Sequence, residues 1–180
     1  MDSASHIRIE RVCTYAGPSV FAREPVVVAR LTIDSEALAD ARTRIERMST
    51  AFSPWFEWQQ SESAPGALEI GKFLVRWTRC ALTEVRVFLH VSDALAVRDG
   101  VLLILGYHDP GISFSALELA AKLFTQIELR SPKEIAASVS ELWRACQRRH
   151  PDYQAVILMS AARSAGIPVL PFLRSSRCWQ

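Results

Sequence analysis

The sequence predicts a single α+β domain in which a mixed or antiparallel sheet packs against about four to five helices. Short segments rich in valine, isoleucine and leucine occur at the start of the chain and again after residue 100, as expected for strands. Longer segments with apolar residues at helical spacing lie between and after them. The 180 residues, 49% of them hydrophobic, are enough for one globular core. We expect the domain to cover residues 1–173 and residues 174–180 to form a loose tail.

Two strands are expected at the start of the chain. Residues 7–15 alternate imperfectly between apolar and charged side chains, and residues 25–33 are rich in β-branched side chains. The segment Gly17-Pro18-Ser19 breaks the pattern between them. The two strands are therefore expected to form an antiparallel hairpin with a long loop over residues 16–24.

Three further strands are expected later in the chain. Residues 86–91 are predicted to form a strand, and Arg98-Asp99-Gly100 is predicted to form a tight turn. Residues 101–107 are nearly all apolar, which predicts a central strand buried on both faces. The last strand is expected over residues 167–172, where two prolines place it at an edge or an end.

The helices are predicted from apolar spacing and from the residues that end them. Asp34 or Ser35 caps the first helix, and Ser131 followed by Glu134 marks the start of another. Gly166 ends the last helix, because glycine tolerates a left-handed backbone. The predicted helices span residues 35–48, 67–85, 113–129 with Ser113 or Ser115 as the cap, 132–149 and 153–165.

An irregular segment over residues 52–64 carries three aromatic residues, Trp55, Phe56 and Trp58. We favour the interpretation that they form a lid over the core, because large aromatic side chains stabilise a fold when they are buried. The alternative is an apolar patch at which copies of the chain associate, since aromatic residues are enriched in interface cores.

Charge and cysteine content exclude several classes of protein. The net charge of +2 is too small to indicate nucleic-acid binding. No apolar run reaches the roughly 18 residues that a membrane span needs, and no signal peptide opens the chain, so a cytoplasmic protein is expected. The cysteines form no CxxC pair, which argues against zinc, and we expect most of them to be reduced and buried. They are Cys13, Cys80, Cys146 and Cys178.

The sequence lacks the short motifs of common catalytic and nucleotide sites. There is no GxxxxGK[ST], GxGxxG, GxSxG, HExxH or HxxEH, so no cofactor, metal or bound nucleotide is expected. His108 beside Asp109 is the only pair that suggests acid–base chemistry, and His90 is a second candidate. A role in stabilising the turn is the favoured interpretation for His108, because adjacent side chains at a strand end point apart.

Two groups of arginines are candidate binding residues. Arg76 and Arg79 are three apart on a predicted helix, so they share a face on which two guanidiniums can hold a carboxylate or a phosphate. The alternative is a solvated helix edge. Arg144, Arg148 and Arg149 lie at a predicted helix C-terminus, where favourable interaction with the helix dipole explains them and a partner surface is the alternative.

Three segments resemble one family. The first is residues 11–19 with residues 23–28, a strand followed by a Gly-Pro loop and a second strand. The second is residues 107–111, Tyr-His-Asp-Pro-Gly, before an alanine-rich helix, and the third is residues 155–172. Together they resemble, in order and spacing over almost the whole chain, the N-terminal domain of cyanophycin synthetase, a ligase that builds an arginine–aspartate polymer.

The resemblance implies which activities to expect. In that family an ATP-grasp ligase domain and a Mur-ligase-like domain follow, whereas this chain ends shortly after Phe172, so both synthetic activities are expected to be missing. The family's long helix can carry an HxxEH metal motif, and the corresponding residues here are Val75, Thr78 and Arg79. Valine cannot bind zinc and arginine repels it, so a peptidase role does not carry over.

The leading hypothesis is a free-standing, non-catalytic accessory domain of ATP-dependent amide ligation. It would hold a charged peptide or amino acid, with Arg76, Arg79 and Arg86 as the expected contacts, or dock onto a separately encoded ATP-grasp or Mur-type ligase. One alternative is a small enzyme with a rebuilt site around His108 or His90. The other is a structural homo-oligomer.

Overall fold

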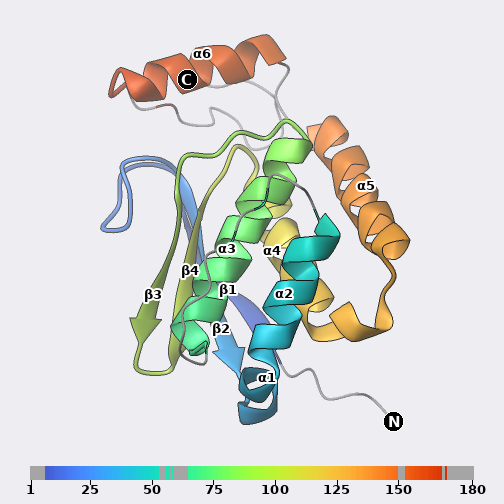
Figure 1. Ribbon diagram of the computed structural model, residues 1–180. Helices are drawn as coiled ribbons and strands as arrows, with labels where there is room; N and C mark the ends of the chain where they lie inside the picture. Colours follow the sequence, from blue (N-terminus) through green and yellow to red (C-terminus); the bar gives the residue numbers. More distant parts are fainter. Residues whose placement is uncertain are drawn as a thin grey trace.

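The computed structural model describes residues 7–52, 56, 58, 65–149, 153–167 and 169, with the backbone alone at residues 52, 149, 153, 154, 156 and 163. It confirms the expected α+β class and a single domain, because one large core lies between the sheet and the helices. Figure 1 shows α3 and α4 lying against the sheet, with α2 and α5 outside them. The sheet is antiparallel at all three of its strand pairings.

The described residues form a four-stranded sheet in the order β1-β2-β4-β3. The strands span Ile7–Tyr15 (β1), Val26–Ile33 (β2), Ser92–Val97 (β3) and Gly100–Gly106 (β4). β1 and β2 form the expected hairpin, with a register shift between Arg11 and Cys13. β4 lies between β2 and β3, so the apolar strand after residue 100 is central, as predicted.

The two inner strands are buried on both faces of the sheet. Successive side chains of a strand point to opposite faces, so Val27 and Leu103 join the main core under the helices. Val28 and Ile104 point the other way and form a smaller cluster against which Phe21, from the loop after β1, is packed. The long loop of the first hairpin therefore covers part of the face that the helices leave open.

Four helices, α2 to α5, form two layers on one face of the sheet (Figure 1). α3 contacts β3 and β4, α4 contacts β1 and β2, and α2 and α5 contact α4 from outside. No helix of the described residues is both long enough and apolar enough to cross a membrane. The helices span Ser35–Ala39 (α1), Ala41–Phe52 (α2), Ala67–Glu84 (α3), Pro110–Gln126 (α4), Ile127–Leu129 (η1, a 3-10 helix), Pro132–Arg149 (α5) and Tyr153–Ser164 (α6).

α3 approaches the sheet closely at Gly71. A Cβ atom placed on Gly71 would lie 2.7 Å from Cγ1 of Val101 and 3.2 Å from Cδ2 of Leu103. Normal contacts between carbon atoms are about 3.5–4.0 Å, so a larger residue does not fit without movement. The absence of a side chain at this position lets α3 lie directly on β4.

The single helix predicted from Asp34 or Ser35 to Met48 is wrong in two respects, because Asp40 divides it into α1 and α2 and because α2 continues to Phe52. Asp34 is the cap of α1, and its carboxylate accepts a hydrogen bond from the Ala37 N–H at 2.8 Å. The Asp40 carbonyl accepts from the N–H of Arg44, so Asp40 begins α2. Aspartate side chains compete with helical hydrogen bonds, which favours them at helix ends.

The strand predicted over residues 86–91 is wrong, because β3 begins at Ser92. Val87 and Leu89 are buried, and this alternation imitates a strand. β3 itself buries only Ala94, so its sequence shows no apolar run from which a strand could be predicted. The tight turn after it was correctly placed, since Val97 pairs with Gly100.

Arg86 ends α3 with a left-handed backbone, at φ 64°. Its N–H donates to the Thr83 carbonyl at 2.9 Å, and the N–H of Val87 donates to the Leu82 carbonyl at 2.7 Å. These two bonds form a Schellman motif, in which glycine normally occupies the left-handed position. A non-glycine residue there costs about 1–2 kcal/mol.

The start of α4 was predicted too late. Asp109, and not Ser113 or Ser115, is the cap, and its carboxylate accepts from the Ile112 N–H at 3.0 Å. Pro110 fits the first turn because its fixed φ is helical and its missing N–H needs no partner there. Ser113 is buried inside the helix and donates to the Gly106 carbonyl at 3.1 Å.

The ends of the last two helices agree with the predictions. The Ser131 N–H donates to the Glu134 carboxylate at 2.7 Å, and the Glu134 N–H donates back to the Ser131 hydroxyl at 3.4 Å. The bond from the Ser131 N–H, together with one from the Ser131 hydroxyl to the same carboxylate at 2.8 Å, lowers the pKa of the Glu134 carboxyl. Gly166 follows α6 at φ 75°. Most of the strand expected over residues 167–172, and the boundary at residue 173, lie outside the described residues.

The aromatic segment before α3 packs onto the core. The ring centres of Phe56 and Trp58 lie 5.7 and 5.3 Å from that of Phe73, both edge to face. Phe56 is 7% exposed and Trp58 is half-buried. The lid interpretation is therefore confirmed for these two residues, which pack against Phe73 of α3. Trp55 lies outside the described residues.

Candidate functional site

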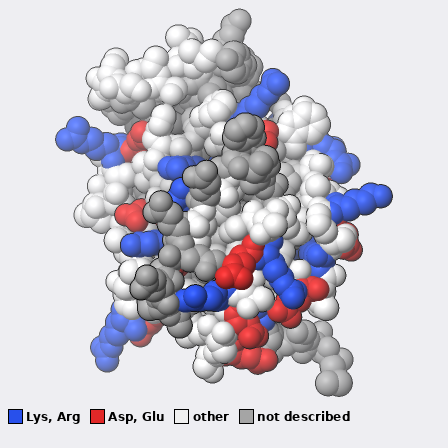
Figure 2. All heavy atoms as spheres, in the orientation of Figure 1, with Lys and Arg blue, Asp and Glu red and all other residues white. Residues whose placement is uncertain are grey.

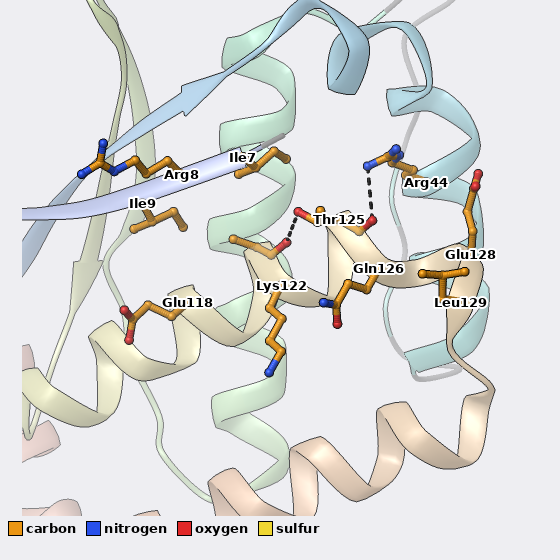
Figure 3. A pocket seen from close by; sticks show the side chains of 11 residues that line it. Ile7, Arg8, Ile9, Arg44, Glu118, Lys122, Thr125, Gln126, Glu128 and Leu129 are labelled. Atoms are coloured by element: carbon orange, nitrogen blue, oxygen red, sulfur yellow. Dashed lines mark hydrogen bonds between the residues drawn. The ribbon is translucent and has the colours of Figure 1, made fainter. Parts of the chain in front are cut away.

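A hollow of about 560 Å³ lies beside the first residues of β1, between α2, α4 and η1 (Figure 3). Its volume is in the range of about 300–1,000 Å³ that is typical of small-ligand sites. Seven of its eleven lining residues are polar or charged, although apolar atoms contribute more of the exposed lining surface than polar atoms do. The residues that line it are Ile7, Arg8 and Ile9 of β1, Arg44 of α2, Glu118, Ala121, Lys122, Thr125 and Gln126 of α4, and Glu128 and Leu129 of η1.

The floor of the hollow is the polar face of α4. Glu118, Lys122 and Thr125 recur at helical spacing on this face, whereas Leu117 and Phe124 of the same helix are fully buried in the core. The Thr125 hydroxyl donates to the Ala121 carbonyl at 2.9 Å. The amphipathic character of α4 therefore places a row of charged and hydroxyl side chains along the hollow.

Arg44 is the buried charged residue of the hollow. It is only 7% exposed, which is uncommon for arginine. Its Nη1 donates to the Thr125 carbonyl at 3.4 Å, and its Nη2 lies 3.7 Å from Oδ2 of Asp40, too far for a hydrogen bond. Its Nε is buried and has no hydrogen-bond partner among the described residues. Most of the donor capacity of this guanidinium is therefore unused.

Charged residues of both signs line other parts of the hollow. Arg8 is exposed and pairs with Glu10 at 2.6 Å. Glu118 and Lys122 are exposed, point outward from α4 in Figure 3, and form no ion pair with a described residue. On the face shown in Figure 2, basic and acidic side chains are likewise interspersed. The hollow can therefore hold a ligand that carries both a negative and a positive group.

The arginines predicted as substrate contacts lie elsewhere. Arg76 is exposed, and its guanidinium carbon lies 5.8 Å from the ring centre of Trp58. Arg79 is half-buried on the same helix, and Arg86 is exposed at its end. None of the three lines the hollow. Arg76 therefore rests on the aromatic lid, which leaves the polar edge of its guanidinium for another partner.

Cys80 lies close to two of these arginines. Burial raises the pKa of its thiol, Glu84 raises it further, and the charges of Arg79 and Arg76 lower it. The opposing effects show that Arg76 and Arg79 share one region of the surface of α3, as their spacing predicted. They form a basic edge that is separate from the hollow.

The second arginine group lies on the C-terminal turns of α5. Arg144 and Arg148 are exposed, and Nε of Arg144 donates to the Ser140 carbonyl at 3.4 Å. The side chain of Arg149 is not among those that the structure describes. Trp143, beside them in sequence, is 43% exposed. Their position fits the helix-dipole explanation, and the partner surface stays a prediction.

Of the three positions at which the resemblance would place a metal motif, Val75 and Thr78 face the core and Arg79 is half-buried. Val75 and Thr78 are 2% and 0% exposed, and the Thr78 hydroxyl donates to the Leu74 carbonyl at 2.7 Å. Among the described residues, no three histidine, cysteine or acidic side chains are grouped so as to hold a metal. α3 therefore uses Val75 and Thr78 for packing against its neighbours.

The two candidate histidines lie apart from the hollow. His108 is 3% exposed, and its Nε2 lies 3.1 Å from the Phe88 carbonyl. Asp109 uses its carboxylate to cap α4. His90 is exposed, with Nε2 3.3 Å from the hydroxyl of Ser160 on α6. Each of these side chains thus connects or ends elements of the fold, and the rebuilt-enzyme hypothesis stays a prediction.

The cysteines that the structure describes are free thiols, at Cys13, Cys80 and Cys146. Cys146 is 2% exposed, and Cys13 and Cys80 are half-buried. Burial, together with the charge of Asp109, raises the pKa of the Cys146 thiol to about 11. A thiol that stays protonated is a poor nucleophile, so Cys146 acts as a small apolar side chain of the core.

Sequence reasoning missed Arg44, although the sequence contained a signal for it. Ala41, Ile45 and Met48 form the apolar stripe of α2, and Arg44 occupies a position on the same stripe, three residues after Ala41 and four before Met48. A charge on the apolar side of an amphipathic helix indicates either a buried pair or a binding group. The other lining residues gave no such signal, because they meet only through the contact of α4 with β1.

No protein-family model matches the chain, and no curated protein sequence matches it. The resemblance to the N-terminal domain of cyanophycin synthetase therefore stays a prediction. The structure gives its three segments a location: residues 11–19 and 23–28 lie in the first hairpin, residues 107–111 join β4 to α4, and residues 155–167 lie in and after α6.

Proposed function

We propose that the chain is a non-catalytic binding domain that holds a charged peptide or amino acid and serves a separately encoded ATP-dependent amide ligase. The observation that carries the binding role is the hollow beside β1, whose lining includes a buried guanidinium and exposed groups of both charges. The association with a ligase rests on the resemblance to the N-terminal domain of cyanophycin synthetase.

The roles of the reactive side chains favour binding over catalysis. The Asp109 carboxylate caps α4, His108 bonds to a backbone carbonyl, and the pKa of Cys146 is raised to about 11. A general base or nucleophile needs to reach a substrate with its proton poised for transfer. These groups are engaged in holding the fold together instead.

Titration calorimetry with synthetic peptides tests the binding role. One peptide contains both aspartate and arginine, and a second of equal length replaces them with serine and glutamine. We expect the charged peptide to bind and the uncharged one not to bind. Because opposite charges attract less strongly in salt, affinity should fall as the salt concentration rises. A chain that binds neither peptide at millimolar concentration contradicts the proposal.

Paired variants locate the surface. Glu118→Gln with Lys122→Gln changes the hollow, whereas Arg76→Gln with Arg79→Gln changes the basic edge of α3. These side chains are exposed or half-buried, so the folded state should tolerate all four changes. Loss of peptide binding in the first pair alone supports the hollow, and loss in the second pair alone moves the site to α3.

The ligase association needs a separate assay. Purified ATP-grasp and Mur-type ligases from the same cell are mixed with the chain. Amide formation is measured from the amount of phosphate that the ligase releases. We expect the chain to lower the KM of one ligase for its peptide substrate. Unchanged kinetics together with no complex by sedimentation would remove this part of the proposal and leave peptide binding intact.

A further inference from the structure

Arg44 is buried without the partners that a buried charge needs. More than nine-tenths of its surface is removed from water, yet its polar contacts with the described residues are one long hydrogen bond to the Thr125 carbonyl and a distant carboxylate at Asp40. Buried charges are normally paired and hydrogen-bonded, because an uncompensated one destabilises the folded state. A guanidinium has five N–H donors, so this one retains several for another molecule.

We propose that Arg44 is a carboxylate-binding residue, which accepts a carboxylate of the ligand inside the hollow through paired N–H donors. The inference rests on the proposed function, since the same hollow holds the peptide or amino acid. Figure 3 shows the guanidinium extending from α2 toward α4 and the start of β1, into the space that the lining residues enclose. A planar carboxylate matches the fork of a guanidinium in both spacing and shape.

The other charges favour a carboxylate over a phosphate. The lining carries two acidic residues, Glu118 and Glu128, and both are exposed without an ion pair to a described residue. Of the two basic lining residues besides Arg44, Arg8 is paired with Glu10, so Lys122 alone offsets the two acidic residues. The negative charge that remains repels a dianion more strongly than a monoanion. The two acidic residues also attract a cation on the same ligand. The site therefore fits a molecule with one carboxylate near a positively charged group.

Two sources can provide this carboxylate, the C-terminus of a peptide and an aspartate or glutamate side chain. Three peptides distinguish these two sources. All three have the same length and carry one lysine at the same position. One has a free C-terminus and no acidic residue, the second is amidated and contains aspartate, and the third is amidated without an acidic residue. The third peptide should bind least in either case, and the tighter of the first two identifies the source.

Three variants on α2 isolate the role of Arg44. Arg44→Met keeps the length of the side chain and removes the charge, and Arg44→Lys keeps the charge but not the fork. Arg47→Met is the matched control, because Arg47 is exposed on the same helix and does not line the hollow. Replacing a poorly paired buried charge by an apolar side chain is often neutral or stabilising. Arg44→Met should therefore melt at the same temperature as the parent chain or higher.

Binding and stability should then change in opposite directions. Loss of charge-assisted hydrogen bonds predicts that Arg44→Met weakens binding of the better carboxylate peptide by about 10- to 100-fold. Arg44→Lys should recover part of this loss, and Arg47→Met should bind as the parent does. If Arg44→Met binds the peptide equally well, the proposal is overturned. A large fall in melting temperature with unchanged binding would assign Arg44 a purely structural role and also overturn it.

A second measurement separates this inference from the proposed function. The NMR resonance of the Arg44 Nε–H group is assigned by its absence from the spectrum of Arg44→Lys. Its position is then followed while succinate, inorganic phosphate or chloride is added. We expect succinate to shift this resonance at lower concentration than phosphate, and chloride to leave it in place. Shifts by succinate without peptide binding support the carboxylate site and reject the peptide-binding role. Peptide binding without a shift of Arg44 keeps the function and rejects this site, and equal shifts by phosphate reject the carboxylate preference.

Discussion

Substitution of Gly71 by alanine tests how closely α3 packs on the sheet. The added Cβ would lie 2.7 Å from Cγ1 of Val101 and 3.4 Å from Cβ of Ala94. Val101 is 1% exposed and β-branched, so it cannot rotate into free space. The helix or the strand must therefore move.

Two effects of opposite sign determine the magnitude. Overpacking a close-packed core costs about 1–3 kcal/mol. Alanine in place of glycine in a helix contributes about 1 kcal/mol in the other direction. We expect Gly71→Ala to lower the free energy of unfolding by about 1 kcal/mol, measured by urea unfolding. For a domain of this size that corresponds to a fall in melting temperature of about 2–4 °C.

The same substitution in a Val101→Ala background provides the control. Removing the valine methyl groups removes the closest contact of the new Cβ and leaves the milder one with Cδ2 of Leu103 at 3.2 Å, so the helix preference should outweigh the remaining crowding. Gly71→Ala should then stabilise this background by up to about 1 kcal/mol. Equal destabilisation in both backgrounds would refute the role of Val101, and stabilisation of the parent chain would refute the packing argument.

Three further substitutions test local features of the fold. Arg86→Gly relieves the strain of the left-handed backbone at φ 64°, although glycine also gives the unfolded chain more conformational freedom. We expect the free energy of unfolding in urea to rise by about 0.5–1 kcal/mol, and a fall would show that this backbone is not strained. Asp109→Ala removes the α4 cap and should cost about 1 kcal/mol, whereas Asp109→Asn should cost less. Folding raises the pKa of the Cys146 thiol from 9.0 to about 11. The stability that the protonated thiol gives the folded state is therefore complete below pH 9 and is lost as the pH rises toward 11. Cys146→Ala should lack this decline between pH 9 and 11, and an unchanged decline would assign it to other groups.

Much of the fold followed from local patterns. β4 was predictable because a strand between two others is apolar along its length, and the ends of α5 followed from Ser131 and Glu134. β3 was missed because an edge strand buries few side chains, so its pairing with β4 is not visible in its own sequence. The break at Asp40 was missed because the apolar stripe continues across it.

The candidate site was less predictable than the fold. Arginines were chosen by charge and spacing, and this selected residues on exposed helix surfaces such as Arg76. Arg44 was passed over because its neighbours in sequence indicate a core helix. Its surroundings include Thr125 and the start of β1, which are distant in sequence and meet it only in the folded chain. A concave site assembled from several elements has no local signal.

The strand order has a consequence for how the chain folds. β1 with β2, and β3 with β4, are hairpins whose strands are near in sequence, whereas β2 and β4 pair across α1, α2 and α3. Pairing β2 with β4 closes the longest loop in the sheet. The chain loses conformational entropy when this loop closes, before the contacts between the two strands can stabilise it. We therefore expect each hairpin to form on its own before β2 and β4 pair along the seam that runs from Leu31–Val101 to Val26–Gly106. Residues along this seam should control the rate of folding, and residues of the outer helix α5 should control the rate of unfolding.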